Sequence, residues 1–163
     1  MGMRRFSGPK TLLFFYLFVR NRSPEFMQES LIGKEDFAAI TKIEVKNRAS
    51  GKNVTLKKIG ETWTGTDSDS SNSFFWPADK ALMEKFFRVV SKEQKAEVRA
   101  TKHSSLAAFD LDDIHATSIN FTSSKGSVAC YLFGKTSADG TGIYFRKWGG
   151  NTVWEIDGEI AEY

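Results

Sequence analysis

The strongest constraint on the fold is the alternation of apolar and polar side chains along several short segments. In residues 40–46, Ile43 and Val45 alternate with charged residues, which is the period of a β-strand with one buried face. The links between such segments are short and polar and often contain glycine, which favours antiparallel hairpins. The sequence therefore predicts strands at about 40–46, 54–59, 62–64, 117–122, 127–134, 142–147 and 152–156, with a further candidate at 95–100.

A single long segment has the period of a helix instead. Residues 76–79 (Trp-Pro-Ala-Asp) are expected to open it, with Pro77 in the first turn, where a missing N–H costs nothing. A shorter helical turn is expected at 104–109. The long helix is expected to run to about Ser91, with an apolar stripe formed by Leu82, Met83, Phe86, Phe87, Val89 and Val90.

The two strand-rich halves of the chain resemble each other. In each half, two apolar residues precede a turn that is followed by valine: Ile43, Val45 and Val54 in the first half, and Ile119, Phe121 and Val128 in the second. This similarity is compatible with a duplicated unit of β-meander and helix. The expected fold class is therefore α+β, with antiparallel β-meander sheets in two similar halves packed around one main amphipathic helix.

The charge of the chain is concentrated at its N-terminus. Residues 1–22 contain five basic residues and no acid, whereas the other 141 residues carry 18 bases and 20 acids, a net charge of −2. The body of the protein is therefore close to neutral. The basic character of the whole chain gives no reason to expect a nucleic-acid partner.

Within this basic segment, residues 11–19 form an uncharged, apolar run. A membrane-spanning helix needs about 20 apolar residues, so the run is short for an anchor, and no small-residue cleavage site follows it. Three interpretations are open: a shortened signal anchor, an interfacial segment with aromatic side chains in lipid, and an amphipathic element docked on the fold. The expected organisation is an anchor-like segment at 1–22, a linker at 23–39 and a domain at 40–163 that is truncated at its C-terminus.

Few residues have the pattern of a catalytic or metal site. Cys130 is the single cysteine, and His103 and His115 lack ligand spacing, so neither a disulfide framework nor a zinc cluster is expected. Residues 134–136 (Gly-Lys-Thr) end like a phosphate loop, but position 129 is alanine where that loop needs glycine, so a hairpin turn is expected. Cys130 lies in an apolar segment and is expected to be a buried, unreactive thiol.

Two acidic segments are also interpreted as turns. The run 67–71 begins like a calcium loop, but Asn72 and Ala78 stand where that loop requires glycine and glutamate. The three aspartates of the segment 110–113 could hold a cation or serve as acid and base, but no orienting partner accompanies them in the sequence. No catalytic residue, cofactor or metal is therefore predicted.

One feature indicates an interaction surface. Basic residues at steps of three and four fall on one face of a continuous helix, opposite the apolar stripe: Lys85, Arg88, Lys92, Lys95 and Arg99. They are either a solvated face whose charge suits the end of a helix, or a contact for anionic lipid headgroups or an acidic partner. The candidate contact residues are Lys85, Arg88, Lys92 and Lys95.

Several short motifs occur in a distinctive order: I-x-x-I-E-V-K-N at 40–47, G-E-T-W at 60–63, W-P-A-D at 76–79, F-D-L-D at 109–112, L-F-G-K at 132–135 and G-I-Y-F at 142–145. Over residues of about 40–160 this order resembles the bacterial domain-of-unknown-function (DUF) 4340 family. The family typically has glycine at the position of Asp110. A tight turn with positive φ, which the family's glycine implies, tolerates aspartate less well than glycine but better than most residues.

The resemblance implies an N-terminal membrane helix, a β-rich extracytoplasmic body and components of gliding-type ABC transporters as partners; it implies no catalytic residues. We therefore expect a non-enzymatic, membrane-tethered extracytoplasmic domain, an accessory or assembly component of an ABC-type transport system, with anionic lipid as a further contact. One alternative is a hydrolase that uses Asp110, Asp112 and Asp113. The other is a soluble β-rich module that binds carbohydrate or peptide through Trp63, Trp76, Trp148 and Trp154.

Overall fold

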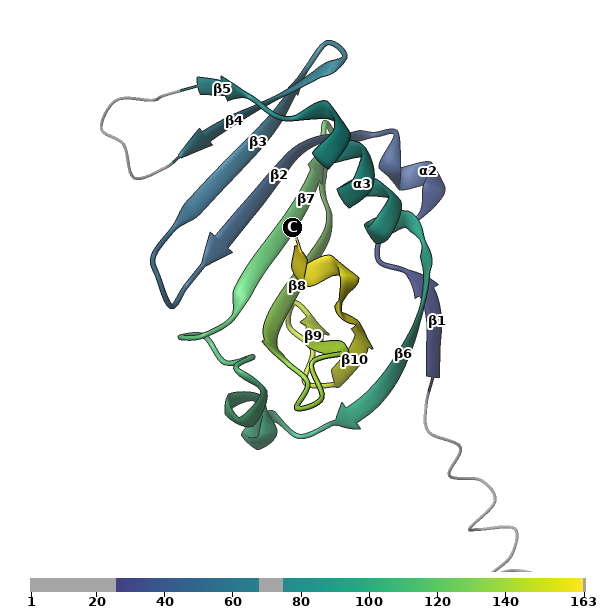
Figure 1. Ribbon diagram of the computed structural model, residues 1–163, viewed down its shortest axis with the longest axis vertical. Helices are drawn as coiled ribbons and strands as arrows, with labels where there is room; N and C mark the ends of the chain where they lie inside the picture. The colour runs from purple at the N-terminus through teal and green to yellow at the C-terminus, as the bar shows by residue number, and fades with distance from the viewer. Residues whose placement is uncertain (1–25, 68–74, 163) are drawn as a thin grey trace, which may run out of the picture.

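The computed structural model describes residues 26–67 and 75–162 and is drawn in Figure 1. The segment 1–22 with its apolar run, and most of the calcium-like segment 67–71, lie outside the described residues. The described strands are β1 (Phe26–Ser30), β2 (Ile40–Asn47), β3 (Asn53–Ile59), β4 (Thr62–Asp67), β5 (Phe75–Pro77), β6 (Glu93–Ala100), β7 (Thr117–Ser123), β8 (Gly126–Thr136), β9 (Gly142–Lys147) and β10 (Val153–Asp157). The helices are α2 (Lys34–Phe37), α3 (Lys80–Ser91) and the 3-10 helices η1 (His103–Phe109) and η2 (Gly158–Glu162).

The strands form one continuous antiparallel sheet in the order β1-β6-β10-β9-β8-β7-β2-β3-β4-β5. The predicted α+β fold, with two sheet halves packed around one main helix, is therefore wrong. The two meanders join edge to edge because β2 pairs with β7, in a register that sets Ile43 opposite Phe121 and Val45 opposite Ile119. The similar segments of the sequence are these two partner strands, and the fold is mostly β with short helices.

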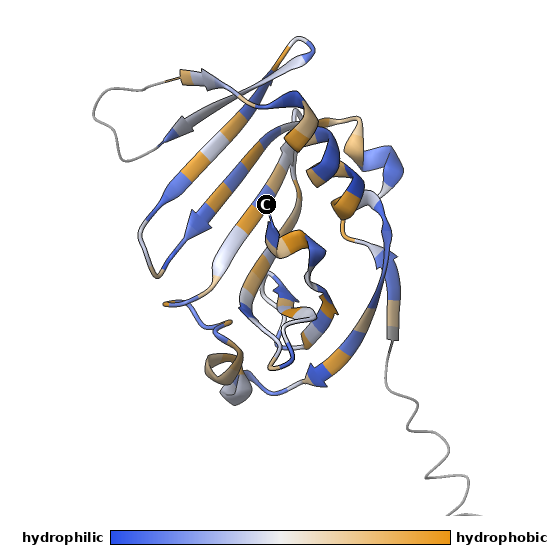
Figure 2. Ribbon diagram, in the orientation of Figure 1, coloured by the Kyte–Doolittle hydropathy of each residue, from blue (hydrophilic) through white to orange (hydrophobic). Residues whose placement is uncertain are grey.

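The sheet is curled, so that β6 and β1 face back toward the middle of the molecule, and α2, α3 and η2 lie on its concave side (Figure 1). Apolar residues alternate with polar ones along β2 and β3, which gives the banding of these strands in Figure 2. The inward residues pack with the helices into the main core, whose fully buried members include Ile43, Val90, Phe121 and Phe145.

Helix α3 begins later than the sequence predicts. The side chain of Asp79 caps it by accepting a hydrogen bond of 2.8 Å from the Leu82 N–H, so the first helical residue is Lys80. Pro77 ends the edge strand β5 instead of entering the helix. The predicted stripe packs into the concave face through its buried members Met83, Phe86, Val89 and Val90, whereas Leu82 is exposed.

The convex face of the sheet carries a smaller core beneath η1. Leu106, Leu111 and Ala116, from η1 and the chain after it, pack against Leu132 of β8 and Val153 of β10. The turn at Asp110, which follows η1, has φ 56°, a conformation that aspartate tolerates better than most residues. The convex face is therefore covered at one end and open along β2, β7 and part of β8.

Residues 26–39, which are predicted to belong to the linker at 23–39, are part of the folded domain. β1 pairs with β6, and the following Leu31 and Ile32 are buried, with Ile32 donating a backbone hydrogen bond of 3.0 Å to Val90. The Tyr131 hydroxyl donates to the Leu31 carbonyl at 2.6 Å. Because polar residues surround Leu31 and Ile32 in the sequence, the local pattern does not indicate that they are buried.

Candidate functional site

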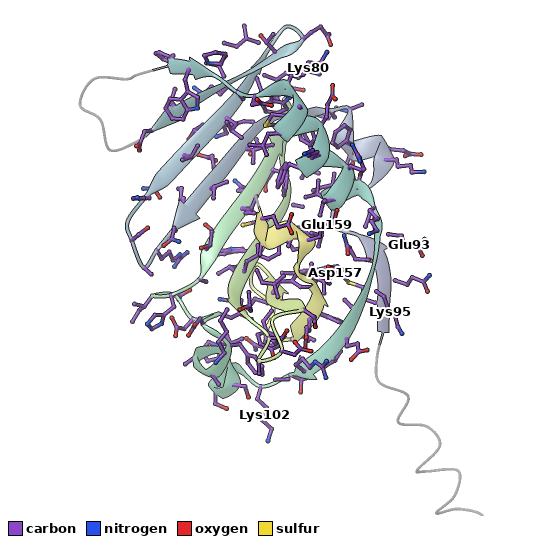
Figure 3. All side chains as sticks on the ribbon, in the orientation of Figure 1. Lys80, Glu93, Lys95, Lys102, Asp157 and Glu159 are labelled. Atoms are coloured by element: carbon purple, nitrogen blue, oxygen red, sulfur yellow. The ribbon has the colours of Figure 1, made fainter. Side chains whose placement is uncertain are left out.

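The predicted basic face is not a face of one helix. Helix α3 ends at Ser91, and Lys92 takes an extended conformation with φ −69° and ψ 141°. Lys85 and Arg88 are exposed on α3, but Lys95 lies on β6, beyond the helix end (Figure 3). After residue 91 the chain is not helical, so the spacing of three and four residues does not place the basic residues on one face.

Acidic residues also neutralise part of this basic set. The Lys92 ammonium lies 3.4 Å from the Glu159 carboxylate on η2. Arg99 on β6 pairs with Glu155 of the neighbouring β10 and, at 3.1 Å, with Glu97. Lys85 and Arg88 are the members that remain as an exposed basic pair on α3.

The aspartates of segment 110–113 hold a turn together. Asp112 accepts hydrogen bonds from the backbone N–H groups of Ile114 and His115 and from Nδ1 of the His115 ring, at 2.8–2.9 Å. The hydrogen bond from His115 lowers the pKa of Asp112, and the same bond raises the pKa of His115. The side chains of Asp112 and His115 are therefore hydrogen-bonded to each other. Asp113 accepts hydrogen bonds from Arg48 and takes no part in this pair.

Two other candidates also have structural explanations. Cys130 is half-buried in β8, and its burial raises the pKa of the thiol, so it is protonated near neutral pH. Gly134 also lies inside β8, where a side chain would overlap the carbonyl of Phe109 as η1 crosses the strand. The glycine of the phosphate-loop-like segment therefore allows close packing of two backbones.

A groove on the convex face brings together residues that the sequence did not connect. Its volume is about 450 Å³, and we call it the convex groove. Its floor is formed by outward side chains of three adjacent strands, and its wall by two residues just beyond strand ends. The floor residues are Glu44 and Lys46 on β2, Ser118 and Asn120 on β7, and Ser127 and Cys130 on β8; the wall residues are Arg48 and Trp148.

The two wall residues, Arg48 and Trp148, contact each other, and each is also hydrogen-bonded to another part of the fold. The Arg48 guanidinium lies over the Trp148 indole, 5.6 Å from the ring centroid. Nη1 of Arg48 also donates to the Asp113 carbonyl at 3.0 Å. The backbone N–H of Trp148 donates to the Cys130 carbonyl at 2.9 Å, and the next residue, Gly149, adopts φ 75°. The tryptophan is therefore fixed at the rim although its side chain is exposed.

A buried arginine beneath the wall supports it further. Nε of Arg146 donates to the Leu111 carbonyl at 2.9 Å, and Nη1 donates to the Gly150 carbonyl at 3.1 Å. Arg146 is 7% exposed, so its hydrogen bonds join the loop after η1 to the loop after β9 within the protein interior. The groove is consequently preformed.

The floor is polar and internally connected. Asn120 donates to Glu44 at 3.4 Å and accepts from the Ser127 hydroxyl at 3.0 Å. Lys42 lies 3.0 Å from the Glu44 carboxylate, and the hydrogen bond from Lys42 lowers the pKa of Glu44. The positive charges of Arg48 and Lys46 act on the Cys130 sulfur in the floor and oppose the rise in its pKa.

The other three predicted tryptophans are partly buried. Trp63 packs against Phe87 of α3, with ring centroids 5.4 Å apart, and Trp154 packs against the main core. Trp76 lies over Gly65, where a side chain would overlap the indole. Trp148 differs from them because it is 57% exposed. Two smaller cavities lie elsewhere, of about 280 Å³ beside α3 and Trp63 and about 380 Å³ between β1 and β8.

Comparisons with known proteins add no relative. No family model matches the chain, and neither a curated protein nor a solved structure is significantly similar to it. The resemblance over residues 40–160 stays a prediction. Among residues 26–67 and 75–162, no helix is long and apolar enough to cross a membrane, and no cluster of three potential metal ligands occurs.

Proposed function

We propose that this chain is a non-enzymatic binding domain that holds a carbohydrate chain in the convex groove. The observation that carries the proposal is Trp148, which is fixed at the rim of a polar groove while 57% of it stays exposed. What distinguishes Trp148 from other exposed apolar residues, such as Phe75, is that its ring borders the polar groove. An indole stacks well on the C–H face of a sugar ring.

The groove floor supplies the other half of sugar recognition. The Glu44 carboxylate accepts hydrogen bonds, and the Asn120 amide and the Ser127 hydroxyl both donate and accept them, as sugar hydroxyls require. These groups belong to adjacent strands, so they stay at fixed spacings. Ligand sites typically combine an aromatic surface with a few polar groups at fixed positions, and the convex groove has both.

The non-enzymatic part of the proposal is supported by the state of the reactive groups. Cys130 is a protonated thiol in the floor, and Asp112 and His115 are hydrogen-bonded to each other in a separate turn. A general base must lie within hydrogen-bond reach of the group it activates. Within the part of the chain that the structure describes, His115 has Asp112 as its hydrogen-bond partner, not the thiol.

The test is binding to an array of neutral and acidic oligosaccharides, followed by calorimetric titration of each hit. Trp148→Ala should abolish binding, and Trp148→Phe should retain part of it because a smaller ring remains. Phe75→Ala is the matched control, since Phe75 is an aromatic residue on β5 that is 62% exposed and lies outside the groove. If no saccharide binds, or if Trp148→Ala binds like the wild type, the proposal is refuted.

A second candidate function is a membrane-tethered, extracytoplasmic accessory domain of an ABC-type, gliding-type transport system. It is favoured by the five basic residues of segment 1–22 around the apolar run 11–19, and by the exposed pair Lys85 and Arg88 on α3. The two functions are compatible, because a tethered domain can present a ligand groove.

Membrane fractionation of the full chain tests the tether, with Phe15→Asp as the variant that should move the protein to the soluble fraction. Liposome binding and pull-down of transporter components test the contact. Changing Lys85, Arg88, Lys92 and Lys95 to Glu should weaken both, most strongly at low salt. A wild-type chain found entirely in the soluble fraction would refute the tether, and unchanged binding of the variant would refute the contact.

A further inference from the structure

We infer that the carbohydrate held in the convex groove is acidic, with the carboxylates of uronic acid residues bound by Arg48 and Lys46. This inference rests on the proposed function and names the class of sugar. It follows from the charges that line the groove, from the donors of Arg48 that remain unused, and from the position of Arg48 against the stacking ring.

The first step concerns the charge of the groove. Its lining contains the cations Lys46 and Arg48 and the anion Glu44. Lys42, whose ammonium is 3.0 Å from the Glu44 carboxylate, already neutralises that anion. Lys46 is exposed two residues from Arg48, at the end of the strand that forms one side of the floor. The groove therefore presents positive charge to a ligand.

The second step concerns the hydrogen bonds of Arg48. Both acceptors that the structure gives to its side chain, the carbonyl and the carboxylate of Asp113, are bound by Nη1, at 3.0 and 3.4 Å. Among the described residues, Nε and Nη2 of Arg48 therefore have no acceptor. These two donors form the edge of a guanidinium that binds a carboxylate with two parallel hydrogen bonds.

The third step concerns placement. The Arg48 guanidinium covers one face of the Trp148 indole, so a sugar ring stacks on the opposite face, and the donors of Arg48 lie behind the same ring. Every residue of a uronic acid chain carries a carboxylate, so one residue can stack while its own carboxylate or that of the next residue reaches past the ring edge to Arg48. The Asp113 carboxylate competes weakly for Arg48. Its side chain is 77% exposed, and its distance of 3.4 Å from Nη1 is long for a charged hydrogen bond.

The experiment compares three probes by calorimetric titration of the full chain: a neutral hexasaccharide of glucose, a hexasaccharide of galacturonic acid, and hexaglutamate. The acidic saccharide should bind about ten-fold or more tightly than the neutral one, since charged hydrogen bonds are the strong ones. Its affinity should fall as salt is raised, while that of the neutral saccharide should not.

Variants assign the effect to the two cations. Arg48→Gln and Lys46→Gln should each weaken binding of the acidic saccharide, with Arg48→Gln costing about ten-fold. Arg48→Lys should restore it only in part, because an ammonium cannot make the paired hydrogen bonds. Lys58→Gln is the matched control: it removes the same charge from an exposed residue on β3 that borders the separate cavity beside α3. Melting temperatures show that each variant is folded.

The outcomes are separable. Equal affinity for the neutral and acidic saccharides, or wild-type affinity of Arg48→Gln for the acidic one, would overturn the inference and leave the proposed function standing. If hexaglutamate binds and neither saccharide does, the occupant is an acidic peptide, and both the inference and the carbohydrate function fail. If no probe binds, the inference fails, and the oligosaccharide array decides the carbohydrate function.

Discussion

The guanidinium of Arg48 lies over the indole ring of Trp148, although the two residues are separated by most of the length of the domain. Arg48 follows β2, and Trp148 follows β9. The contact therefore ties together the ends of strands that are not neighbours in the sheet. It converts an exposed aromatic side chain into a fixed wall, and the proposed ligand site depends on it.

Truncation of Phe86 should cost the domain much of its stability. Phe86 is 9% exposed and stacks on Phe121 of β7 at a centroid distance of 6.2 Å. Phe86→Ala is expected to lower the free energy of unfolding by about 3–5 kcal/mol, and Phe86→Asp should leave the domain unfolded. Urea denaturation followed by circular dichroism measures this. Leu82→Ala, on the exposed side of α3, should change stability little, and a wild-type melting temperature for Phe86→Asp would contradict the packing.

The cap of α3 should have a measurable but smaller effect. Asp79 accepts a hydrogen bond of 2.8 Å from the Leu82 N–H. Asp79→Ala removes it and should lower the free energy of unfolding by about 1 kcal/mol, whereas Asp79→Asn should preserve most of it. Equal losses in the two variants, measured by urea denaturation, would show that the cap is not the cause.

The Asp112–His115 pair should make stability depend on pH. The hydrogen bond to Asp112 raises the pKa of His115 from 6.5, so its contribution is complete below the unfolded value and is lost as pH rises through the folded value. The hydrogen bond from His115 lowers the pKa of Asp112 from 3.8, so that contribution is present above the unfolded value and is lost as pH falls through the folded value.

The stabilising effect of the pair is therefore greatest between these two ordinary values, in mildly acidic solution. The difference in melting temperature between the wild type and His115→Gln should be largest there and should shrink at alkaline pH. Titration of the His115 ring by NMR should give a pKa above its ordinary value. A normal pKa, with a melting difference that is the same at every pH, would mean that the pair does not form in solution.

Gly134 should tolerate no side chain. A Cβ at this position would overlap the carbonyl of Phe109, which is backbone and cannot rotate away. Gly134→Ala is expected to destabilise the domain by about 1–3 kcal/mol, as other overpacked sites do. Gly33→Ala is a suitable comparison, because the nearest atom there belongs to the movable side chain of Asp36. Similar melting temperatures for the two variants would argue against the crossing of η1 and β8.

Much of the strand pattern could be predicted from the sequence, because alternation and turn residues are local signals. β2, β7, β9 and η1 lie close to their predicted positions. The end of α3 at Ser91 is also as predicted. The basic face is wrong because it needs the helix to continue to Arg99, whereas its basic residues continue at helical steps into β6. β1 has no clear strand pattern in the sequence, because the buried residues Leu31 and Ile32 that follow it lie in a polar segment.

The convex groove could not be predicted, for a different reason. Trp148 is a candidate from its residue type alone, but Glu44, Lys46 and Asn120 are ordinary outward polar residues. They become neighbours through the pairing of β2 with β7, and the local pattern of either strand does not specify its partner. The signal present in the sequence is the run of polar residues on the outward side of both strands.

The pairing of β2 with β7 also sets an order of events during synthesis. β2 emerges from the ribosome long before β7, with β3–β6 and α3 made in between, so the edge of β2 that later meets β7 is exposed until then. An unpaired edge is a template for pairing with other chains, and contacts distant in sequence form slowly. A chain interrupted before residue 117 therefore lacks four of the six floor residues of the groove and keeps an unpaired strand edge. Completion of the site and protection from aggregation thus occur in the same step.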